Sequence, residues 1–118
     1  MIWTKRVYEP AGPEDGTRIL VDGLWPRGIA KEALSLDSWN RDVAPSNKLR
    51  KSFHHDVARW DEFRERYFIE LDNNPGAWSS IIGLARDGNL TLLYAAKDKE
   101  HNNAEVLKEY LESKVKTW

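Results

Sequence analysis

The chain has 118 residues, of which 41% are hydrophobic and 31% charged, with a net charge of -1 and no cysteine. A chain of this length buries about two-thirds of its surface on folding, so we expect residues 1–118 to form one domain. The absence of cysteine excludes disulfides, thiol catalysis and cysteine-ligated zinc, and the balanced charge does not favour binding to nucleic acid. With no apolar run of about 20 residues and no secretory signal at the N-terminus, the sequence predicts a cytoplasmic protein without a membrane partner.

Two strands are predicted in the first quarter of the chain. Residues 2–8 place Trp3 and Val7 among charged neighbours, which is typical of a half-exposed strand. Residues 9–16 contain two prolines and two glycines and therefore form a loop. Residues 19–21 are a short apolar run that ends at Asp22 and Gly23, as expected of a strand covered on both faces.

The middle of the chain is predicted to be helical. Ser35 is a candidate N-cap for a helix that ends before Pro45 and carries three apolar residues on one side, namely Leu36, Trp39 and Val43. Ser46 begins a second short helix, and Asp56 precedes a longer one. The apolar residues of the longer helix recur at intervals of 3, 4 and 4, at Trp60, Phe63, Tyr67 and Leu71.

The last third alternates helix, strand and helix. After the break at residues 73–76, a helix is predicted from the spacing of four apolar residues, Trp78, Ile81, Ile82 and Ala85. Residues 90–96 are interrupted only by Thr91, which indicates a central parallel strand. Asn102 can cap a final helix, with Glu105 three residues later. This order predicts an α/β fold with a small, mainly parallel sheet between helices, a three-layer α/β/α sandwich.

The two loops that follow the apolar strands are the candidate ligand site, because open parallel sheets bind ligands at the carboxyl ends of their strands. The first loop holds Asp22 and Arg27 around the stiff Trp25-Pro26 pair. These charges could bind an anion or a metal, or could form an ion pair that only fixes the loop. Trp25 could form a flat wall for a ring or a sugar.

The second loop lies directly before the last helix, whose free N–H groups favour anions. Its candidate residues are Lys97, Asp98, His101 and Asn102. The alternative is that the lysine is solvated and Asp98 assists capping. We expect the two loops to converge, so that Asp22, Arg27, Lys97 and Asp98 line one cleft.

Two further features lie on the central helices. Arg64 falls on the apolar side of its helix and either enters the ligand cleft or pairs with an acid. His54, His55 and Asp56 point in different directions, so capping by Asp56 is favoured over a metal site, and His55 could act as an acid or base beside Asp22. Arg50 and Lys51 belong to a basic patch that is expected to be solvated.

Three blocks of the sequence resemble the small bacterial YeaO-like family, within domain-of-unknown-function group 488. They contain Val21-Asp22-Gly23-Leu24-Trp25-Pro26-Arg27-Gly28, Phe53-His54-His55-Asp56 and Tyr94-Ala95-Ala96-Lys97-Asp98. The resemblance covers essentially the whole chain and implies a cytosolic α/β sandwich, but it implies no activity and no catalytic residues. This chain differs from the family at Gly23, where arginine is usual, and at Asn103, where histidine is common.

The leading functional hypothesis is a site for a small anionic ligand, with or without hydrolytic or phosphoryl-type turnover. Arg27, Lys97 and the start of the last helix would hold the anion, Trp25, Arg64, His101 and Asn102 would complete the site, and Asp22 or Asp98 would be the catalytic group. The sequence assigns no metal site and no cofactor. The alternative is a non-catalytic module that binds protein or nucleic acid through Arg50, Lys51 and Arg59.

Overall fold

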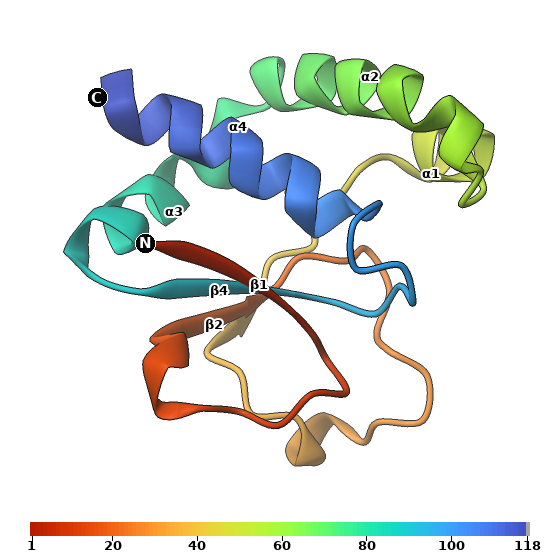
Figure 1. The fold of residues 1–118 in the computed structure, drawn as a ribbon. Coiled ribbons are helices and arrows are strands. Elements are labelled where there is room, and N and C mark those ends of the chain that lie inside the picture. The colour runs from red at the N-terminus through yellow and green to blue at the C-terminus, as the bar shows by residue number, and fades with distance from the viewer. Residues whose placement is uncertain (118) are drawn as a thin grey trace.

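The computed structural model describes residues 1–117, which form one four-stranded parallel sheet and four α-helices (Figure 1). The strands are β1 (Ile2–Arg6), β2 (Thr17–Leu20), β3 (Ser38–Trp39) and β4 (Leu90–Tyr94). The helices are α1 (Asn47–Phe53), α2 (Trp60–Asp72), α3 (Pro75–Asp87) and α4 (Asn103–Thr117). No helix within this range is long and apolar enough to cross a bilayer.

The strand order is β1-β4-β2-β3, and every pair is parallel. The predicted central strand is confirmed, since β4 lies between β1 and β2 and is buried along its whole length. Because all four strands run the same way, their carboxyl ends lie at one edge of the sheet. The chain segments that follow β1, β2 and β4 therefore meet there.

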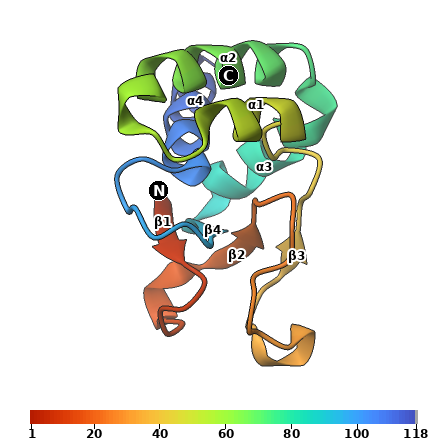
Figure 2. The same cartoon turned by 90° about the vertical axis from the view of Figure 1, so that its right-hand side faces the viewer.

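All four α-helices cover one face of the sheet (Figure 2). Leu90, Leu92 and Tyr94 alternate along β4 toward this face and share one apolar cluster with the buried sides of α1 to α4. The spacing predicted for α2 is largely confirmed, because Phe63, Tyr67 and Leu71 are buried while Trp60 packs at the cluster's edge. Ser46, predicted to begin a helix, and Asn102, predicted to cap one, accept hydrogen bonds from the backbone N–H groups of Leu49 and Glu105.

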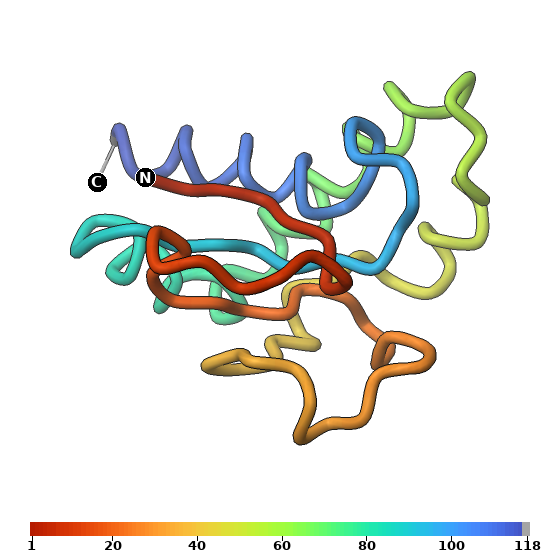
Figure 3. Tube along the Cα trace, turned by 60° about the horizontal axis from the view of Figure 1, so that its bottom comes forward, coloured from red at the N-terminus to blue at the C-terminus, as the bar shows by residue number. Residues whose placement is uncertain are grey.

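The other face of the sheet has a thinner cover than the predicted sandwich. Here Leu20 and Leu93 pack against apolar side chains of the segment that follows β2, namely Trp25, Ile29, Leu34 and Leu36. This segment contains a 3-10 helix (Lys31–Ala33) and lies beneath the sheet, away from α4 (Figure 3). The expected fold class is confirmed, but the second outer layer is a connecting segment with one short turn of 3-10 helix rather than an α-helix.

The helix predicted to start at Ser35 is wrong. Residues 38 and 39 form β3 instead, which pairs with Ile19 and Leu20 of β2. The spacing of Leu36, Trp39 and Val43 fits a helix, yet the first two pack on one face of the sheet and Val43 packs in the cluster on the other. A segment that passes around the edge of a sheet can place apolar side chains on both faces of the sheet. Sequence periodicity does not distinguish this arrangement from a helix.

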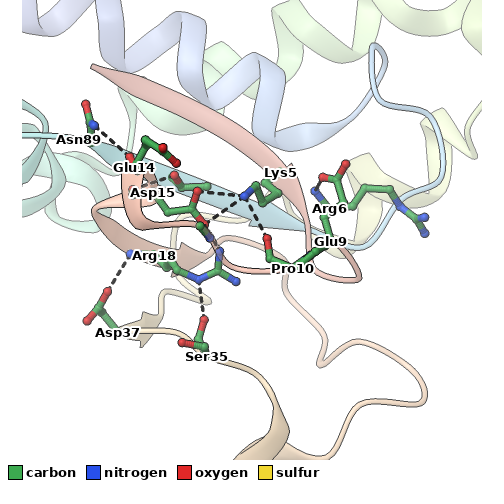
Figure 4. A network of polar contacts seen from close by, with 12 residues as sticks. Lys5, Arg6, Glu9, Pro10, Glu14, Asp15, Arg18, Ser35, Asp37 and Asn89 are labelled. Carbon is green, nitrogen blue, oxygen red and sulfur yellow. Dashed lines mark hydrogen bonds and ion pairs between the residues drawn. The ribbon is translucent and has the colours of Figure 1, made fainter.

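A buried ionic network lies on the face of the sheet opposite the helices (Figure 4). Arg18 of β2 forms an ion pair with Asp15, which belongs to the 3-10 helix Pro13–Asp15. The Arg18 Nε also donates to the Ser35 carbonyl at 2.6 Å. Lys5 of β1 lies 2.9 Å from the same carboxylate. Gly16, the residue after the 3-10 helix, has a φ of 63°. A Cβ at this position would lie 2.1 Å from the Asn89 carbonyl oxygen, so glycine is required.

Candidate ligand cavity

A cavity of about 400 Å³ opens at the carboxyl ends of the strands. One wall is the loop after β2, another is α1 with the turn that follows it, and the floor includes Ala95 and Ala96 after β4. The volume lies within the usual range for small-molecule sites, about 300–1,000 Å³. Four residues predicted for the site line this cavity, namely Asp22, Trp25, Arg27 and Asn102.

Asp22 is fixed at the cavity floor by two hydrogen bonds. The backbone N–H of Ala95 donates to its Oδ2 at 2.9 Å, and the side-chain amide of Asn103 donates to its Oδ1 at 3.0 Å. Burial raises the pKa of Asp22, although these two bonds and the charges of Arg50 and His55 act in the opposite direction. The carboxylate is thus held in place by β4 and α4, and Asp22 forms no ion pair with Arg27 among residues 1–117.

The loop after β2 is held by three aromatic side chains that donate to its carbonyl oxygens. Trp39 Nε1 donates to the Asp22 carbonyl at 2.7 Å, and the Tyr8 hydroxyl donates to the Arg27 carbonyl at 2.9 Å. Trp25 Nε1 donates to Ile29 at 2.7 Å, and its ring contacts Trp39 edge to face. This loop has no regular secondary structure of its own, so these contacts determine where Trp25 and Arg27 lie.

The opposite wall contains residues that were not part of the leading hypothesis for the site. Arg50, expected to be solvated, lines the cavity from α1 together with Asn47 and Phe53. His55 also lines it, which places an imidazole in the same cavity as Asp22, as one of the sequence hypotheses required. It follows His54 at the end of α1, and both residues have positive φ, 45° and 53°. The left-handed turn directs the chain back beside the cavity.

Four of the residues predicted for the site are not among those that line the cavity. Lys97 directly follows the lining residue Ala96 and is exposed. Asp98 accepts hydrogen bonds from the N–H groups of Glu100 and His101 and from the His101 imidazole, so it organises the loop before α4. Arg64 forms a two-bond ion pair with Glu109 of α4, on a separate surface depression. The structure therefore brings together only part of the expected constellation.

The cavity carries more positive than negative side chains. Arg27 and Arg50 line it, and neither pairs with a carboxylate among residues 1–117, whereas Asp22 is the one acid along its lining in that range. The remaining lining is largely apolar and aromatic, with Trp25, Phe53 and Phe63. No group of three acidic or histidine side chains suited to a metal ion occurs in the part of the chain that the structure describes.

Comparison with known proteins identifies the family. The model described as "Inactive DUF488-N3 subclade" matches residues 1–117. The chain belongs to this family. It is 47% identical to the uncharacterized protein YeaO of Escherichia coli (strain K12) over 112 residues, which cover 95% of this chain and 97% of YeaO. The predicted YeaO-like resemblance is confirmed.

More distant relatives match over most of the same length. The uncharacterized protein Rv3073c of Mycobacterium tuberculosis is 40% identical over 106 residues, which cover 90% of this chain and 89% of that protein. Protein MICRORCHIDIA 5 of Arabidopsis thaliana is 27% identical over 105 residues, which cover 89% of this chain and only 14% of the plant protein. No solved structure matches the chain.

Proposed function

We propose that this protein binds a small organic anion in the cavity at the carboxyl ends of its strands, without chemical turnover. The observation that carries the proposal is the pair of cavity arginines, Arg27 and Arg50, that have no carboxylate partner within residues 1–117. A guanidinium group binds carboxylate or phosphate through two parallel hydrogen bonds. The aromatic lining suits the apolar body of such a ligand.

Binding without turnover is favoured by two observations. The family description contains the word "inactive". In addition, the two predicted catalytic carboxylates are engaged differently: Asp98 accepts backbone N–H groups in its own loop, and Asp22 alone reaches the cavity. We therefore give Asp22 a binding role and Asp98 the role of positioning the start of α4. Lys97, next to Ala96, would add to the positive potential at the rim.

The test is calorimetric titration with inorganic phosphate, sulfate and 3-phenylpropionate as probes. We expect Arg27→Gln and Arg50→Gln each to weaken binding of the best probe at least tenfold, because each removes a charged hydrogen-bond donor, an effect of about 1.4 kcal/mol or more. Arg66→Gln is the matched control, since it removes the same charge from α2 outside the cavity. Equal affinities in all three variants, or no binding of any probe to the wild type, would contradict the proposal.

A further inference from the structure

The floor of the cavity presents hydrogen-bond acceptors. Each Asp22 oxygen accepts one hydrogen bond from the protein and has a further lone pair available. The Asn103 side-chain Nδ2 donates to the Val21 carbonyl at 3.2 Å and to the Asp22 carboxylate. A carbonyl and an ionised carboxylate can only accept hydrogen bonds, which identifies the Asn103 atom that faces them as the amide nitrogen. Its Oδ1 therefore lies on the other side of the amide and accepts no hydrogen bond from residues 1–117.

The walls of the same cavity present donors. Arg27 and Arg50 carry guanidinium groups and cannot accept hydrogen bonds. A ligand with only an anionic group would pair with the arginines but would place no donor against the acceptors at the floor. Leaving Asp22 and Asn103 covered by an apolar group would cost the binding energy of unpaired polar atoms. A ligand that has both an anionic group and a donor group can pair with the donors and the acceptors of the lining at the same time.

We infer that the ligand is an amphoteric small molecule, in which a carboxylate or phosphate binds Arg27 and Arg50 while an amino or hydroxyl group donates to Asp22 and Asn103. This inference rests on the proposed function and adds a second recognition point to it. The apolar side chains of the same lining, such as Trp25, Phe53 and Phe63, would contact a hydrocarbon or ring portion of the ligand. Amino acids and hydroxy acids with apolar side chains have this arrangement of groups.

The test uses matched sets of probes that differ only in the two polar groups. One set is L-phenylalanine, 3-phenyllactate, 3-phenylpropionate and 2-phenylethylamine, and an aliphatic set is L-leucine, 4-methylpentanoate and isopentylamine. We expect the amino acid of at least one set to bind wild-type protein at least tenfold more tightly than the acid without a donor, and the amine to bind more weakly than either. A hydrogen-bonding site discriminates strongly against an analogue that lacks the bonded group.

Two variants separate this inference from the proposed function. Asp22→Asn should abolish the preference for the amino acid over the simple acid. Arg27→Gln should weaken binding of the amino acid and of the simple acid by the same factor. If the simple acids bind wild type as tightly as the amino and hydroxy acids, the inference is overturned and the proposed function stands. If no acid of either set binds, the inference is overturned, and if inorganic phosphate and sulfate do not bind either, the proposed function fails with it.

A second measurement is available if Asp22→Asn does not fold. In wild type, lowering the pH to about 4 should shrink the ratio of the affinity for the amino acid to the affinity for the simple acid, each calculated for the carboxylate form of the probe, because protonation removes the charge of Asp22. The other titratable groups that act with Asp22 are Arg50 of α1, His55 after α1 and Tyr67 of α2. Burial raises the pKa of Tyr67, which keeps its proton over this range, and the same ratio in His55→Gln excludes the imidazole as the cause. A ratio that does not change with pH in either protein overturns the inference.

Discussion

At the scale of single residues, Asp22 combines stabilising hydrogen bonds with the unfavourable burial of its carboxylate. Two protein donors fix its oxygens, yet burial dominates and raises its pKa. A carboxylic acid whose pKa is higher in the folded than in the unfolded chain binds protons preferentially in the folded state. Its contribution to the free energy of unfolding is therefore present at low pH, below the ordinary pKa of aspartate, and is lost as the pH rises through the raised value.

This gives a pH-dependent prediction for Asp22→Asn. Because wild type loses stability at this position as the pH rises, we expect the substitution to cost less stability at about pH 7 than at about pH 4. Urea denaturation of both proteins at the two pH values measures the difference. The carboxylates Glu9, Asp98 and Glu109, whose pKa values are lowered, act in the opposite direction in both proteins and cancel in the comparison. A larger cost at pH 7 would show that hydrogen bonding outweighs burial at Asp22.

At the scale of elements, α2 is held by an aromatic ladder rather than by one anchor. Phe63 stacks on Phe53 of α1 with ring centroids 4.5 Å apart, and Tyr67 donates to the Val43 carbonyl at 2.5 Å. Trp60, at the first position of α2, is only half-buried and meets His101 edge to face at 5.0 Å. The ladder also positions the cavity, because Phe53 and Phe63 belong to both.

We expect Phe63→Ala to destabilise the protein by about 3–5 kcal/mol, because it opens a cavity inside the cluster. Trp60→Ala should cost less, about 1–3 kcal/mol, since part of its ring already contacts solvent. Chemical denaturation of the two variants gives both values. If Trp60→Ala proves the more damaging substitution, then the amino-terminal end of α2 rather than its middle holds the helix to the sheet.

At the scale of the whole molecule, the two faces of the sheet are stabilised by different interactions. The helical face is an apolar cluster, whereas the other face combines a small apolar cluster with the network of Lys5, Asp15 and Arg18. Burial alone would raise the pKa of Asp15, but hydrogen bonds from Lys5, Gly12 and Arg18 lower it overall. The charged form of Asp15 is thus the stable one in the folded protein, and the network links β1, β2 and the loop between them.

A double-mutant cycle tests this network. Arg18→Met and Asp15→Asn should each cost about 3–5 kcal/mol, because each removes the charged partner of a buried side chain. The double variant should cost clearly less than the sum of the two, since no uncompensated charge then remains between these two positions. Unfolding free energies of the four proteins complete the cycle. Additive costs would mean that the two side chains stabilise the fold independently.

The sequence alone determined the parallel sheet with β4 at its centre, the helices α1 to α4, the start of α1 at Ser46, the cap at Asn102, and the site residues of the loop after β2. These features depend on local patterns: continuous apolar runs, helical spacing, capping residues and a loop that directly follows a strand. Asp22, Trp25 and Arg27 could be found because any residue directly after a parallel strand lies at the ligand-binding edge of the sheet.

Only the tertiary structure decided which other side chains reach that edge. Arg50 and His55 line the cavity because α1 packs across the strand ends and the left-handed turn at His54 reverses the chain, and neither contact has a periodic signal in the sequence. Arg64 was expected either to enter the cleft or to pair with an acid, and the approach of α4 gave it Glu109 as its partner. The segment 35–43 matched helical spacing but is shared between two faces of a sheet, so its form depended on strand pairing with β2, a contact about 20 residues away in the chain.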